Sequence, residues 1–166
     1  GEVSLSDRSS IWNPSFNSNT NSFPTGGIQV EGRRVVLEER SRIASVTQGS
    51  QAGGDILINA TEALEIGVAS GIISQVEEGS SGNGGAIIVT APQLRLFDGG
   101  RISSLSFGDG GGGNSEVNAS DSIAISGLAL GGGEDFNSGI LTENYSAGSG
   151  GNIAVSTRQL NLLDGG

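Results

Sequence analysis

The sequence predicts an all-β protein, a parallel β-helix in which short strands wind into the stacked coils of a solenoid. One observation is a repeat: Gly-Gly pairs begin at positions 26, 53, 84, 112 and 150, at spacings of 27, 31, 28 and 38 residues. A period of roughly 20 to 50 residues is typical of solenoids, whose units bury their apolar faces against neighbouring units. The second observation is that apolar residues alternate over short runs, as in half-buried strands. No segment carries the apolar stripe at i, i+3 and i+4 that a helical repeat needs.

Each repeat predicts three short strands, which are clearest in the unit that begins at the third Gly-Gly pair. Residues 87–89 form a β-branched run, and residues 94–96 alternate between apolar and polar. Between them Thr90-Ala91-Pro92-Gln93 breaks the pattern, and Asp98-Gly99-Gly100 is typical of a turn. A third run over 102–106 completes the unit. We therefore expect about five coils with three short strands in each.

The other units align on this one residue by residue. The second strand of each coil carries a pair of apolar residues two positions apart, and the third strand begins at an isoleucine. The pairs are Val3/Leu5, Val35/Leu37, Leu64/Ile66, Leu94/Leu96, Ile123/Ile125 and Leu160/Leu162, and the isoleucines are Ile11, Ile43, Ile72, Ile102 and Ile140. We expect one β-helix domain over 1–166, cut from a longer chain. It would hold the last two-thirds of one coil, four full coils and the start of another.

Stacking of such coils predicts how the protein packs. Parallel strands lie about 4.8 Å apart, so equivalent side chains form ladders and the apolar positions become continuous internal columns. Glycines at the corners are expected to permit positive φ angles and a close approach of adjacent coils. An all-β sandwich is the alternative, but it favours longer strands joined by antiparallel hairpins over a repeat that matches residue by residue.

The composition argues against several functions. The chain has no cysteine and no histidine, so it lacks thiolates, disulfides and the usual general base and imidazole ligand. Its formal net charge of −10 disfavours nucleic acid and anionic membranes as direct partners. No run approaches the ~20 apolar residues of a membrane span, so membrane insertion is not expected.

The acidic residues favour a structural interpretation. Asp7, Glu39, Asp98 and Asp164 occupy one corner of the repeat, which indicates a solvent-facing turn rather than a catalytic pair. The other carboxylates are scattered along the chain, without the pairing that acid–base catalysis requires. We predict that the chain is not an enzyme and holds no cofactor.

The basic residues are all arginine, and four of them lie close together in the sequence. They are Arg33, Arg34, Arg40 and Arg42. One interpretation is a solvated face in which these side chains pair with the neighbouring Glu31, Glu38 and Glu39. The other is a patch that binds anions or acidic glycans. Both interpretations stay open at the level of sequence.

The first departure from the repeat covers residues 12–25. It carries the aromatic residues Trp12, Phe16 and Phe23. Insertions in solenoids form loops on one flank, where they often bind partners. The segment is therefore either a hydrophobic clasp over the side of the rod or an aromatic contact surface for a sugar or a neighbouring protein.

The second departure covers residues 128–137, in which three glycines precede Glu134, Asp135 and Phe136. Clustered carboxylate and carbonyl oxygens suit calcium. The segment has neither EF-hand spacing nor a GGxGxD repeat, and a mobile surface loop is the other interpretation. With the three aromatic residues of the first insertion, these residues are the candidate partner contacts.

Three stretches of the chain resemble a known family. GGDILINATEALEI (53–66), GGAIIVTAPQLRLFDGGRISS (84–104) and GGNIAVSTRQLNLLDGG (150–166) are similar to repeats of filamentous-haemagglutinin-like exoproteins, in particular the large cyanobacterial ones. The resemblance implies a right-handed parallel β-helix, exported by two-partner secretion through an outer-membrane partner. It also implies a secreted or cell-surface location on a Gram-negative-type bacterium. The family's secretion motif is not matched, because Asn13-Pro14 is followed by Ser15-Phe16.

These observations lead to three hypotheses for function. The first is a secreted or cell-surface structural protein, a rigid shaft for adhesion, matrix or surface coating, with glycans or other cell-surface proteins as partners. The second is a self-assembling extracellular filament, because end coils present unpaired strand edges that allow end-to-end self-association. The third is a carbohydrate-binding or polysaccharide-cleaving β-helix, which would need a groove lined by aromatic residues and carboxylates.

Overall fold

The computed structural model describes residues 1–16, 26–129 and 136–166, and this part of the chain consists of strands and turns without a helix. Two sets of strands alternate along the chain. The first set comprises β1 (Glu2–Leu5), β3 (Ile28–Leu37), β5 (Ile56–Ile66), β7 (Ile87–Phe97), β9 (Ser115–Ser126) and β13 (Ile153–Leu163). The second set comprises β2 (Ser10–Phe16), β4 (Arg42–Gln48), β6 (Gly71–Val76), β8 (Arg101–Ser106) and β12 (Gly139–Asn144).

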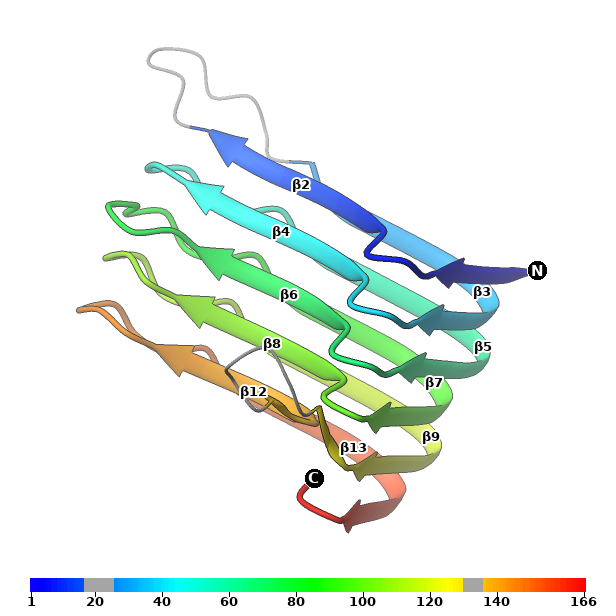
Figure 1. The fold of residues 1–166 in the computed structure, drawn as a ribbon. Coiled ribbons are helices and arrows are strands. Elements are labelled where there is room, and N and C mark those ends of the chain that lie inside the picture. The colour runs from blue at the N-terminus through cyan, green and yellow to red at the C-terminus, as the bar shows by residue number, and fades with distance from the viewer. Residues whose placement is uncertain (17–25, 130–135) are drawn as a thin grey trace.

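Each set forms one parallel sheet. The first set makes a six-stranded sheet in the order β1-β3-β5-β7-β9-β13, and the second makes a five-stranded sheet in the order β12-β8-β6-β4-β2. Figure 1 shows the resulting coils stacked in chain order from the N-terminus to the C-terminus. The predicted all-β parallel solenoid is confirmed.

The coil count also agrees with the repeat. The pairs β3–β4, β5–β6, β7–β8 and β9–β12 complete four coils, while β1–β2 ends a preceding coil and β13 begins a following one. Between β9 and β12 the chain forms a small antiparallel pair of β10 (Leu128–Ala129) and β11 (Phe136–Asn137). This pair lies within the second predicted insertion.

The strands differ from the three short ones expected in each coil. The first two predicted runs belong to one continuous strand, as in β7, where the pairing with β9 shifts register between Ala91 and Gln93. Equivalent shifts lie between Gly32 and Arg34 in β3 and between Thr157 and Gln159 in β13. Figure 1 shows each long strand bending before its arrowhead. An irregularity of this kind lets a strand turn a corner while backbone pairing continues on both sides.

The register confirms the predicted columns. In the second part of the long strands, Val3, Val35, Leu64, Leu94, Ile123 and Leu160 pair in succession from coil to coil. In the short strands, Ile11, Ile43, Ile72, Ile102 and Ile140 do the same. Apart from Leu160, these side chains join one hydrophobic core, in which Leu64, Leu96 and Ile102 are 0% exposed. The core is therefore a set of ladders that runs along the axis of the solenoid.

The Gly-Gly pairs bring adjacent coils into close backbone contact. A Cβ on Gly85 would overlap the carbonyl oxygen of Gly54, and a Cβ on Gly113 would overlap that of Gly85. None of these glycines has a positive φ, which occurs instead at turn glycines such as Gly99 (φ 80°). Glycine thus permits both the close approach of coils and the positive φ angles that the sequence predicted, but different glycines do each.

The interior of the short strands is partly polar, which the apolar pattern did not predict. Two residues after Ile43, Ile72 and Ile102 a serine faces inward, and Ser45, Ser74 and Ser104 are all buried. The Ser74 hydroxyl donates to the carbonyl oxygen of Gly85 at 2.7 Å. Ser74 thus joins the short sheet to the Gly-Gly segment, whereas the buried hydroxyls of Ser45 and Ser104 have no hydrogen-bond partner among the described residues.

Replacing Leu96 with Ala should lower the free energy of unfolding by about 3 kcal/mol, because the side chain is fully buried in a laddered column. Leu57→Ala is the matched control, since Leu57 lies on the outer face of β5 and is 39% exposed. We expect it to change stability by less than about 1 kcal/mol. Urea denaturation followed by circular dichroism measures both. Equal losses would show that the inward column is wrongly assigned.

Gly85→Ala should destabilise the protein by about 3 kcal/mol, because the added methyl group overlaps backbone that cannot move without separating two coils. Gly26→Ala serves as the control, since no heavy atom of the described residues lies within 4 Å of its added Cβ. Thermal melting of the two variants should separate them clearly. A Gly85→Ala variant with the same melting temperature as the parent protein would contradict the close backbone contact between these two coils.

Candidate functional site

A column of tight turns joins the two sheets at the ends of the long strands. In each turn both central residues have a positive φ, the geometry of a type I′ turn. The central pairs are Asp7-Arg8 (53°, 61°), Glu39-Arg40 (55°, 64°), Val68-Ala69 (50°, 57°), Asp98-Gly99 (48°, 80°) and Asp164-Gly165 (47°, 86°). The four acidic residues predicted to share a corner therefore do so, and all four are exposed.

Backbone hydrogen bonds stack the turns on one another. The N–H of Arg8 donates to the carbonyl oxygen of Glu39 at 3.0 Å, and the N–H of Arg40 donates to that of Val68 at 2.9 Å. Each turn is also closed by its own bond, such as Ser41 N–H to Glu38 O at 3.2 Å. Side chains at equivalent turn positions consequently lie beside one another on neighbouring coils.

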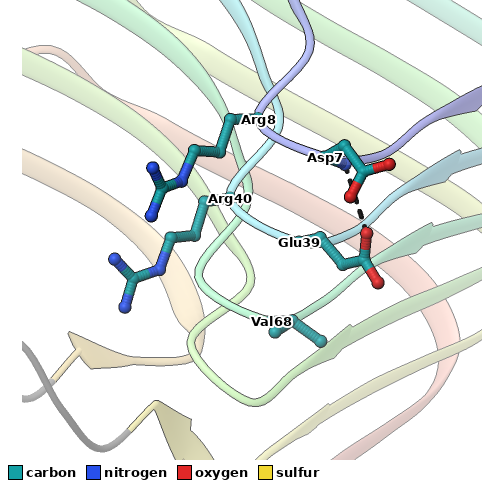
Figure 2. A pocket seen from close by; sticks show the side chains of 5 residues that line it. All are labelled: Asp7, Arg8, Glu39, Arg40 and Val68. Atoms are coloured by element: carbon teal, nitrogen blue, oxygen red, sulfur yellow. Dashed lines mark hydrogen bonds between the residues drawn. The ribbon is translucent and has the colours of Figure 1, made fainter.

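The first three turns enclose an open hollow of about 330 Å³ lined by Asp7, Arg8, Glu39, Arg40 and Val68. Figure 2 shows the Arg8 and Arg40 side chains extending together to one side of the turns, while Asp7 and Glu39 lie on the other. The N–H of Asp7 donates to Oε2 of Glu39 at 3.2 Å, which holds that carboxylate against the turn. The hollow thus has a cationic side and an anionic side.

The structure separates the sequence cluster of arginines into different environments. Arg33 pairs with Glu62 at 2.9 Å, and Arg34 pairs with Glu65 at 2.7 Å. Both carboxylates belong to β5 of the following coil. The interpretation in which these two arginines pair with glutamates of their own coil is wrong. An arginine side chain on the outer face of a strand lies closer to the side chains of the adjacent strand than to those of residues next to it in sequence.

The candidate contacts of the first insertion are only partly within the described residues. Trp12 lies in β2, opposite Ala44 of β4, and is 56% exposed. The backbone of Phe16 ends the same strand opposite Gln48, whereas Phe23 lies outside the described residues. The exposed Trp12 therefore stays a candidate contact, and the choice between clasp and contact surface stays open.

In the second insertion, Phe136 lies in β11 opposite Ala129, while Glu134 and Asp135 lie outside the described residues. The predicted calcium site falls on those two carboxylates. Within residues 1–16, 26–129 and 136–166, no group of three or more acidic, cysteine or histidine side chains is placed to hold a metal ion. The described strands that flank the two insertions, β2 and β12, are the outer strands of the described short sheet.

An exposed aromatic pair was missed by sequence reasoning. The rings of Phe107 and Tyr145 stack with centroids 5.0 Å apart and planes at 5°, and the residues are 39% and 63% exposed. Each is the fifth residue after the isoleucine of its short strand, Ile102 or Ile140. Their shared place in the repeat was the signal that could have predicted the contact.

Comparison of the chain with family models, curated proteins and solved structures gave no match. The parallel β-solenoid that the filamentous-haemagglutinin resemblance implies is present, while membership of that family stays a prediction. The described residues include no helix of the length and apolarity that a membrane span requires.

Val68→Asn should raise the free energy of unfolding by about 1 kcal/mol. A β-branched residue in the left-handed region is strained, whereas Asn tolerates it, and Val68 is 43% exposed, so little packing is lost. Val36→Asn on β3 is the control and should lower stability, because a strand position favours valine. Chemical denaturation compares the two. A loss of stability at position 68 would mean that packing outweighs strain there.

Proposed function

We propose that this chain forms part of a rigid β-helical shaft in a secreted or cell-surface protein that serves adhesion, matrix formation or surface coating. The observation that carries the proposal is the parallel pairing of both sheets through every described coil. Each coil is bonded to its neighbours along two sheets and shares one apolar interior with them. A rod built this way resists bending, because any bend must separate strands in at least one sheet.

The location and the export route in this proposal rest on the resemblance of the repeats. A chain exported through an outer-membrane partner crosses the membrane before it folds, and one without cysteine needs no disulfide formation afterwards. The role assigned to the chain is mechanical rather than catalytic. Glycans or other cell-surface proteins would bind to the flanks of the shaft, where Trp12 is exposed.

A self-assembling filament is the second candidate, because the parallel pairing that joins coils within the chain is equally able to join a coil to one of a second copy. In a shaft the stacked coils belong to one chain, whereas in a filament they belong to successive copies.

Electron microscopy of the native material, combined with antibody labelling of intact source cells, tests the proposal. A shaft should appear as rods of constant width, and intact cells or their culture fluid should carry the antibody signal. Rods that join end to end into continuous fibres would favour the filament. Labelling that appears only after cell lysis would contradict both candidates.

A further inference from the structure

Arg8 and Arg40 form a pair of like charges at the edge of the solenoid. They are the second central residues of two stacked turns, and their coils are joined by the hydrogen bond from the Arg8 N–H to the Glu39 carbonyl oxygen. Figure 2 shows both side chains extended in the same direction with their guanidinium groups at the same side of the hollow. Two cationic groups are therefore presented together to solvent.

No carboxylate neutralises this pair in the described part of the chain. Among residues 1–16, 26–129 and 136–166, neither Arg8 nor Arg40 has an acidic oxygen within ion-pair distance. Arg33 and Arg34, which are nearby in sequence, are each paired across the coils. Like charges held side by side repel each other unless an opposite charge compensates for them.

The backbone at these positions is also unfavourable for arginine. Both residues have φ in the left-handed region, at 61° and 64°, where a side chain adds strain. The equivalent turns carry Ala69, Gly99 and Gly165, of which the glycines avoid that strain. Because the same turn also forms with alanine or glycine at this position, the fold does not require the two arginines, and their side chains are available for a function.

We infer that Arg8 and Arg40 together bind one oxyanionic group, a carboxylate, sulfate or phosphate, either as a free anion or carried on an acidic polymer. The guanidinium is a planar fork of N–H donors that matches the oxygens of such groups, and two forks side by side on adjacent coils offer donors to one group together. The open hollow beside the turns leaves room for it.

The acidic residues of the hollow do not occupy the space in front of the two guanidinium groups. Glu39 is held against the turn by the N–H of Asp7, and Figure 2 places both carboxylates on the side away from the guanidinium groups. The chain's net charge of −10 opposes the long-range approach of a polyanion. Binding should therefore depend on this local pair rather than on the charge of the whole surface.

Nuclear magnetic resonance of the arginine side-chain N–H groups tests the inference with inorganic sulfate, inorganic phosphate and acetate, each titrated at constant ionic strength against chloride. The Arg8 and Arg40 signals should shift together and saturate, while those of Arg33 and Arg34 stay in place. Removing one guanidinium, as in Arg40→Gln, should weaken binding about tenfold, because each charge-assisted contact contributes enough for one decade of affinity.

The double variant Arg8→Gln/Arg40→Gln should lose binding, and Arg33→Gln/Arg34→Gln is the matched control, since it removes the same charge from paired positions. Circular dichroism should show both variants folded, because Arg8, Arg33 and Arg40 are exposed and Arg34 is only half-buried. An unsaturable shift, or the same loss in both double variants, would overturn the inference as a general charge effect.

A second experiment distinguishes a free anion from an anionic group carried on a polymer. Immobilised protein is exposed to polyuronate, dextran sulfate and neutral dextran, with and without the tightest small anion. Binding of an acidic polymer that the small anion displaces, and that Arg8→Gln/Arg40→Gln abolishes, assigns the site to a polymer-borne group. Saturable binding of small anions alone assigns it to a free anion. Polymer binding that is unchanged in that double variant would overturn the site, while the shaft proposal would stand.

Discussion

Hydrogen bonds between parallel strands hold adjacent coils at one strand spacing along both sheets, and the rest of the structure adapts to that distance. At about 4.8 Å, branched apolar side chains stack into filled columns. The same distance leaves no room for a Cβ where the connecting segment of one coil crosses the next, so Gly54, Gly85 and Gly113 are required there. One spacing therefore explains both the apolar repeat and the Gly-Gly pairs that mark it.

The register of the coils was predictable because it depends on features that repeat along the chain. Matching Leu94 with Ile123, or Ile72 with Ile102, needs only the period, and the structure pairs them as expected. The continuous long strand was not predictable from apolar pattern, because Thr90 to Gln93 interrupts the side-chain alternation without interrupting backbone pairing. Strand bends depend on backbone geometry, which the alternation of side chains does not record.

The candidate site was less predictable than the fold. The sequence placed Arg33, Arg34, Arg40 and Arg42 in one cluster, but a solenoid brings together residues one coil apart rather than residues close along the chain. Arg34 thus pairs with Glu65, 31 residues away, and Arg40 lies on the turn stacked against that of Arg8, 32 residues away. The repeat alignment already placed Asp7 with Glu39. The same alignment, applied to the residues that follow them, would have placed Arg8 beside Arg40.

A solenoid converts one position of the repeat into a line of side chains along the rod, so a site forms wherever consecutive coils carry the same chemistry. The line that holds Arg8 and Arg40 continues with Ala69 and Gly99, which carry no charge. Toward the C-terminus the charged pair therefore ends by substitution alone, without any change in backbone path, since the third turn keeps the same left-handed geometry. The shaft and the site are separable for this reason: the columns inside determine that the rod forms, and the turn residues outside determine where along it an anion binds.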